Sequence, residues 1–237
     1  MLTITDAYLI HTFFDLIAAL GAVAGGYCVY RWRLEEHLPR MTDRIGYGYF
    51  LFLSLGSIVG AFLFGTLNLY LSGIPEIGRS IIGAIFGATL MVELYKGRRG
   101  TRGSTGYIYV IPLIVVIIIG RLGCLFSGLA DDTFGVATGK AWGWDFGDQV
   151  LRHPVALYES VSMLLFLIGS LAILQARVDL FTRYGFYVCI GYYAVQRFLW
   201  EFLKPYQDIA GPLNVFQIIC LILVFYSIIM IGKARYE

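Results

Sequence analysis

Long apolar segments alternate with short polar connections along almost the whole chain. A helix of about 20 apolar residues crosses the hydrocarbon core of a bilayer, and seven segments approach or exceed that length. They lie at about 8–30, 47–71, 78–95, 107–127, 154–175, 184–203 and 212–232. The third is the shortest and is rich in glycine. The pattern predicts an all-α integral membrane protein with seven transmembrane helices.

Lysine and arginine are unevenly distributed between the connections, and cytoplasmic loops carry the excess of these residues. One side of the predicted membrane receives twelve: Arg31, Arg33, Arg40, Arg44, Lys96, Arg98, Arg99, Arg102, Arg177, Arg183, Lys233 and Arg235. The other side receives four: Arg79, Lys140, Arg152 and Lys204. We therefore expect the N-terminus outside and the C-terminus in the cytoplasm.

Composition supports this class of protein. Of 237 residues, 58% are hydrophobic and 14% are charged, against about 25% charged in soluble domains. No linker or low-complexity tract divides the chain, which predicts one transmembrane domain over 1–237. The net charge of +2 is too small to indicate nucleic acid. Because the three histidines lie far apart in sequence, with no familiar ligand spacing, we expect no metal and no cofactor.

Several ionisable residues fall inside the predicted spans, all toward the outer half of the membrane. Arg121 interrupts the fourth span, Glu159 lies early in the fifth, and Arg197 and Glu201 lie late in the sixth. Tyr193, Arg197, Glu201 and Lys204 have the spacing of one helical stripe. Charges facing lipid are costly, so intramembrane charges usually mark a substrate or ion site. For any single residue, an ion pair that holds two helices together is the alternative.

The longest connection, at about 128–153, lies on the outer side and is rich in Gly, Asp and Trp. Long connections of this kind often form a lid or a site wall. It ends in RHP, which places His153 at an N-cap and Pro154 in the first helical turn. A helix N-terminus beside Arg152 is an anion site, although His153 could serve only as a cap.

The expected ligand is an anion that carries apolar tails. A guanidinium donates two hydrogen bonds in a fork and stays charged when partly desolvated, so arginine suits phosphate. An anionic membrane phospholipid entering between the helices fits this description.

Three motifs, GRLGCLFSGLADDTFG, RHPVALYE and QRFLWEFLKPYQD, occur in an order and spacing that resembles the prolipoprotein diacylglyceryl transferase family. GPLNVFQIICLILVF resembles the family's last helix. The resemblance implies a bacterial inner-membrane enzyme that moves the diacylglyceryl group of phosphatidylglycerol to a lipobox cysteine thiol of a prolipoprotein signal peptide. It aligns Arg121 with the arginine of the family's GR motif and Arg197 with the essential arginine of the sixth span.

Three positions depart from the family pattern. Ile82 stands where a histidine proposed as catalytic is usual, and Cys124 replaces the asparagine of G-R-x-G-N. Ser127-Gly128-Leu129 replaces N-G-E, and the adjacent Asp131 and Asp132 could supply the missing carboxylate. The acceptor and the base that activates it are therefore less well defined than the lipid donor.

These observations give a set of candidate site residues. The predicted catalytic residues are Arg121, Arg197, His153 and Glu201, with His153 the leading candidate for the base. The predicted substrate-binding residues are Arg121, Arg152, Asp131, Asp132, Tyr158 and Glu159. A non-catalytic phospholipid-binding or lipid-translocating membrane protein is the alternative function, which the absent histidine favours.

Overall fold

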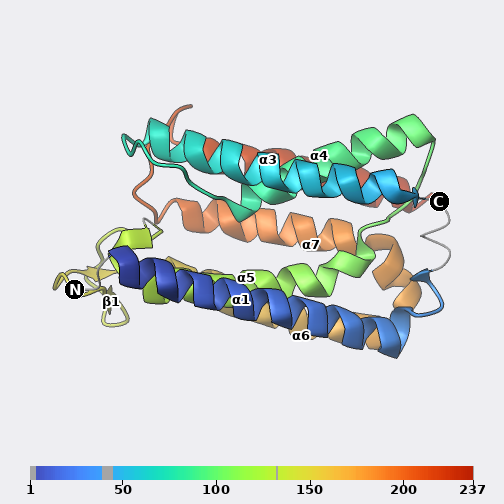
Figure 1. The fold of residues 1–237 in the computed structure, drawn as a ribbon, viewed down its shortest axis with the longest axis horizontal. Helices are drawn as coiled ribbons and strands as arrows, with labels where there is room; N and C mark the ends of the chain where they lie inside the picture. The colour runs from blue at the N-terminus through green and yellow to red at the C-terminus, as the bar shows by residue number, and fades with distance from the viewer. Residues whose placement is uncertain (1–3, 39–44, 132, 237) are drawn as a thin grey trace. The chain divides into compact units, whose positions relative to one another are not determined.

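The computed structural model describes residues 4–38, 45–131 and 133–236, which form a predominantly helical protein (Figure 1). The α-helices are α1 (Ile4–Val29), α3 (Tyr47–Leu71), α4 (Ile81–Arg99), α5 (Val110–Ser127), α6 (Val155–Ala176), α7 (Val178–Glu201) and α8 (Val215–Ala234). Short helical turns are η1 (Tyr30–Leu34), η2 (Tyr107–Tyr109) and η3 (Gly128–Asp131). Strands β1 (Trp144–Asp145) and β2 (Leu151–Arg152) pair antiparallel within the connection before α6. The prediction of an all-α protein is confirmed.

Five of the described helical segments are long and apolar enough to cross a membrane. They are Asp6–Leu34, Tyr47–Leu71, Tyr107–Asp131, Val155–Ala176 and Val215–Ala234. Helices α4 and α7 fall at the other two predicted spans but are less apolar. The protein is therefore a multi-pass membrane protein by the length and composition of its helices.

The contacts divide the chain into two compact units. The first contains α1, α5, α6 and Leu199–Pro205. Its helices α1 and α5 pack along each other, because glycines on both permit close approach. Val115 lies against Gly21, and a Cβ atom placed on Gly123 would lie 2.8 Å from the Cβ of Phe14.

The second unit contains α3, α4, α8 and Asp179–Phe198 of α7. Helices α3 and α4 lie side by side (Figure 1) with their backbones almost touching. A Cβ atom on Gly83 would lie 2.5 Å from the carbonyl oxygen of Gly60, and Gly56 faces Gly87 in the same way. Small residues spaced four apart on both helices permit such close packing.

At two helix ends, the difference from the sequence prediction affects candidate site residues. Pro154 is the N-cap of α6, so His153 precedes the cap and the expectation of a His153 cap is wrong. Helix α7 ends at Glu201, so Lys204 lies in the following turn instead of extending the helical stripe. Lys204 is nevertheless buried.

Helix α1 leaves large apolar side chains on its surface. Leu9, Leu16, Leu20 and Val23 each expose more than half of their area. Exposed apolar area of this extent is unusual for a helix in water and is expected for a helix that contacts lipid chains.

Candidate functional site

A buried ion-pair network joins α5, α6 and the turn after α7, all within the first unit. The Nε atom of Arg121 lies 2.9 Å from Oε2 of Glu159, and the Nζ atom of Lys204 lies 3.2 Å from Oε1 of the same carboxylate. Glu159 has no exposed area, and both cations are also buried. Paired charges of this kind are tolerated inside a membrane protein, whereas burying an isolated charge there is energetically costly.

The polypeptide positions Lys204 in this network through hydrogen bonds of the preceding turn. Leu203 N–H donates to the carbonyl of Trp200 at 3.0 Å, and Lys204 N–H donates to that of Glu201 at 3.1 Å. The Leu203 carbonyl in turn accepts from Val136 N–H at 2.7 Å. The connection that precedes α6 is thereby attached to the network.

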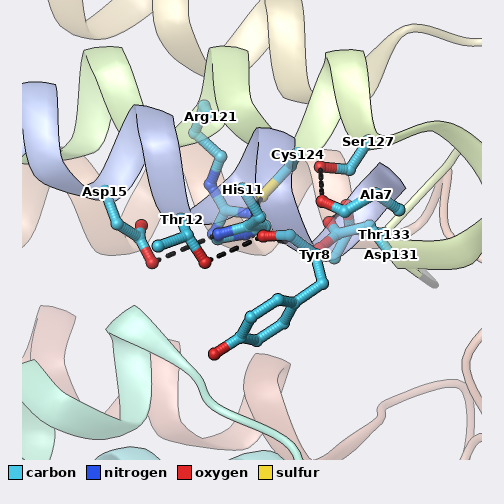
Figure 2. Close-up of polar contacts among 10 residues, drawn as sticks. All are labelled: Ala7, Tyr8, His11, Thr12, Asp15, Arg121, Cys124, Ser127, Asp131 and Thr133. Carbon is cyan, nitrogen blue, oxygen red and sulfur yellow. Dashed lines mark hydrogen bonds and ion pairs between the residues drawn. The ribbon is translucent and has the colours of Figure 1, made fainter. Parts of the chain in front are cut away.

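A second polar cluster lies where α1 meets the last turns of α5 and η3 (Figure 2). His11 of α1 is at its centre. Its Nδ1 lies 3.3 Å from Oδ2 of Asp15, and its Nε2 lies 3.3 Å from Oδ1 of Asp131 and 3.6 Å from Sγ of Cys124. The side chain of Thr133 donates a short hydrogen bond to Asp131.

Arg121 connects the two clusters. Glu159 contacts its Nε atom, while its terminal Nη1 lies 3.9 Å from Cys124 Sγ. The close approach of α1 and α5 beside Gly123 brings His11 to this position, and Ser127 supports it by donating to the carbonyl of Ala7 at 3.1 Å. The site therefore combines a held guanidinium with a thiol, an imidazole and a carboxylate.

The residues of the RHP motif form a third group at the start of α6. The Nδ1 atom of His153 lies 3.3 Å from the hydroxyl of Tyr158, whose ring packs against Trp200 with centroids 5.3 Å apart. Arg152 donates to Asp148 at 2.8 Å and lies over the Phe134 ring. The interaction with Asp148 balances the charge of Arg152, and a role of Arg152 in anion binding stays a prediction.

The predicted residues of α7 are also buried. Arg197 lies in the second unit with its guanidinium carbon 5.6 Å from the centre of the Phe216 ring. Glu201, at the end of the helix, belongs to the first unit. The catalytic roles of Arg197 and Glu201 stay predictions.

The site thus contains some predicted residues and some that the sequence analysis did not select. Arg121 and Glu159 are in direct contact, Asp131 joins the second cluster, and Tyr158 contacts His153. Asp132 lies outside the described residues. The sequence does not single out His11, because the three histidines show no ligand spacing among themselves. The pair His11–Asp15, one turn apart in an apolar helix, is the signal that could have identified it.

The fold and the buried charges define a multi-pass helical membrane protein with a polar site inside its helices. The sequence model of the family described as prolipoprotein diacylglyceryl transferase matches residues 5–232. The chain belongs to this family and is a transferase.

Similar proteins carry the name phosphatidylglycerol–prolipoprotein diacylglyceryl transferase. The chain is 28% identical to the one from Chloroherpeton thalassium over 240 residues, which covers 93% of this chain and 87% of the relative. It is 26% identical to one from Dehalococcoides mccartyi over 93% of this chain and 88% of the relative. With one from a Wolbachia strain of Drosophila simulans, identity is 28% over 64% of each chain. No solved structure matches the chain significantly.

Proposed function

We propose that this protein transfers the diacylglyceryl group of phosphatidylglycerol to the thiol of a cysteine in a prolipoprotein signal peptide. The family match over residues 5–232 carries this proposal. The product is a thioether, and glycerol phosphate leaves. The proposed location is the bacterial inner membrane, where both the lipid donor and the signal peptide are accessible.

The chemistry requires stabilisation of a departing phosphate. As the bond between the glyceryl carbon and the phosphate oxygen breaks, negative charge grows on the phosphate. Positioned cations in a site with little water stabilise such charge effectively. Arg121 suits this task because Glu159 holds its Nε and so fixes the direction of the guanidinium fork. We assign Arg197 to the same phosphate.

The remaining predicted residues are given supporting roles. Glu159 positions Arg121, and Glu201 positions Arg197 by charge. Tyr158, Arg152 and Asp131 are assigned to the wall that receives the substrates, and Asp132, which lies outside the described residues, stays a predicted substrate-binding residue. His153 is proposed to accept the proton of the acceptor thiol.

The proposed topology has seven spans, with the N-terminus outside and the C-terminus in the cytoplasm. It places the connection that contains β1 and β2 on the outer face of the membrane. Single cysteines introduced at Gly147 and Gly97 in a variant lacking Cys28 test this arrangement. A membrane-impermeant thiol reagent should label the cysteine at Gly147 in intact cells and the one at Gly97 only after lysis. The reverse pattern would contradict the topology.

Incubation of the purified protein with phosphatidylglycerol and a lipobox peptide tests the activity. Mass spectrometry should detect a peptide that has gained one diacylglyceryl group, and a peptide whose lipobox cysteine is replaced by serine should gain none. Ile82, at the usual histidine position, favours the alternative of a lipid-binding or lipid-translocating protein. Retention of labelled phosphatidylglycerol without any thioether would support that alternative.

A further inference from the structure

His11, Cys124 and Asp131 offer three different ligand atoms to a single point. One atom from each residue lies within 4.8 Å of the other two. The residues come from α1, from α5 and from η3, and Figure 2 shows their side chains directed toward one another. All three are partly buried.

The two separations measured from His11 fit tetrahedral metal coordination. With bonds of about 2.0 Å to nitrogen and oxygen and about 2.3 Å to sulfur, ligand atoms around a tetrahedral zinc ion lie roughly 3.3 to 3.8 Å apart. His11 Nε2 lies 3.3 Å from Asp131 Oδ1 and 3.6 Å from Cys124 Sγ.

The second nitrogen of His11 has the partner that a ligating histidine usually has. Nδ1 lies 3.3 Å from the Asp15 carboxylate. A carboxylate in this position favours the tautomer in which Nδ1 carries the proton and Nε2 keeps a free lone pair. That lone pair then faces a carboxylate oxygen and a sulfur atom. Atoms of this kind lie so close together when a proton is shared between them, as in the hydrogen bond between Cys124 Sγ and His11 Nε2, or when they ligate one cation.

We propose that His11, Cys124 and Asp131 bind one zinc ion, and that the thiolate of the acceptor cysteine occupies its fourth position. A mixed set of nitrogen, sulfur and oxygen ligands suits zinc, and three protein ligands with one open position are typical of catalytic zinc. Thiolate and carboxylate together balance the charge of the dication, which favours the ion in a site of low dielectric. The role of the fourth position rests on the transferase function proposed above.

Because Ile82 replaces the usual histidine, the family pattern does not show which group activates the acceptor thiol. The proposed zinc site would activate it. The thiol loses its proton to His153, and its sulfur binds the metal as thiolate. The sulfur then attacks the glyceryl carbon, forming the C–S bond. The C–O bond to phosphate breaks, and its electron pair leaves with glycerol phosphate beside Arg121. Cys124 thus has a use that the asparagine usual at this position in the family could not fulfil.

Metal content of the purified full chain tests the inference without any substrate. After exposure to zinc and dialysis in mild detergent, we expect about one zinc per chain. Cys124→Ser and His11→Ala should each retain less than about a tenth of that amount. Asp15→Asn should bind zinc about 10 to 100 times more weakly, as expected for loss of a carboxylate partner. Cys28→Ser, which removes an exposed thiol from the same helix as His11, is the matched control and should retain full zinc.

Two further measurements distinguish loss of the zinc site from misfolding of a variant. Zinc should raise the Tm of the wild type and of Cys28→Ser, because a ligand that binds the folded state stabilises it, and it should not raise that of Cys124→Ser. Cobalt should produce a thiolate-to-metal absorption band in Cys28→Ser that is absent from Cys124→Ser. Less than about a tenth of a zinc per wild-type chain, or equal zinc in Cys124→Ser, overturns the site.

The assays separate failure of this inference from failure of the proposed function. Thioether formation by chelator-treated protein that contains no zinc would overturn the metal's role and leave the transferase function intact. Zinc binding with no thioether formed from phosphatidylglycerol would overturn the transferase function, while the zinc site would stand on its metal content.

Discussion

Arg121 and Glu159 form an ion pair between α5 and α6, with 2.9 Å between Arg121 Nε and Glu159 Oε2. The carboxylate also contacts Lys204, so one acidic residue holds cations from two separate segments of the chain. An anion so placed stabilises the fold and also directs the arginine that is proposed to receive the phosphate.

Replacement of Glu159 by glutamine should therefore destabilise the protein strongly. Removing one partner of a buried ion pair costs about 3–5 kcal/mol, because the other charge stays buried. Thermal unfolding in detergent should show a large fall in Tm. Glu76→Gln, at an exposed position, is the control and should unfold like the wild type. A Glu159→Gln protein of unchanged Tm would show that the pair contributes little.

Arg197→Lys should impair the transfer reaction more than conservation of charge suggests. Lysine keeps the positive charge but lacks the planar fork that binds two phosphate oxygens. We expect kcat/KM to fall more than about tenfold, which corresponds to about 1.4 kcal/mol of lost transition-state stabilisation. Arg183→Lys, at an exposed position of the same helix, should keep the full rate. Near-normal turnover by Arg197→Lys would show that a point charge is sufficient.

His153→Ala should change how the rate depends on pH. A general base acts only in its unprotonated form, so the rate of the wild type should fall as the solution becomes acidic. Without the imidazole, the rate should be lower and this fall at acid pH should disappear. His37→Ala serves as the control. If His153→Ala keeps both the full rate and the acid limb of the profile, His153 is not the base.

Gly123→Ala should disturb the site more than Gly120→Ala, although both glycines lie in α5. A methyl group on Gly123 would meet the Cβ atom of Phe14 at 2.8 Å, whereas one on Gly120 has no described atom within 4 Å. Overpacking of this kind costs about 1–3 kcal/mol and shifts the backbone. We expect Gly123→Ala alone to lower Tm and transfer activity. Equal behaviour of the two variants would argue against close packing of α1 on α5.

Hydrophobic patterning predicted the helices well because each long apolar run must satisfy its backbone hydrogen bonds locally. The second span at 47–71 coincides with α3. The ends of other helices were less predictable. Pro154 takes the cap position in place of His153, and the chain leaves α7 at Glu201, because contacts of the following turn prevail over helical periodicity.

The site was predictable where one residue violated the apolar pattern. Arg121 and Glu159 are charges in otherwise apolar segments, and the structure pairs them. The cluster around His11 was not predictable in the same way. It joins residues of α1 to residues of α5 and η3, and Cys124 lies 113 positions after His11 in the sequence. Such contacts depend on which helices pack together, and local sequence does not specify that choice.

The partnership of α1 with α5 has a consequence for biogenesis. His11 is synthesised before α3, α4 and most of α5, so its partner Cys124 is added 113 residues later. At ordinary rates of translation this interval is on the order of 10 s. Asp15, one turn along the same helix and 3.3 Å away in the finished protein, is already available to pair with His11. Part of the polarity of α1 can thus be compensated during insertion, before the site exists.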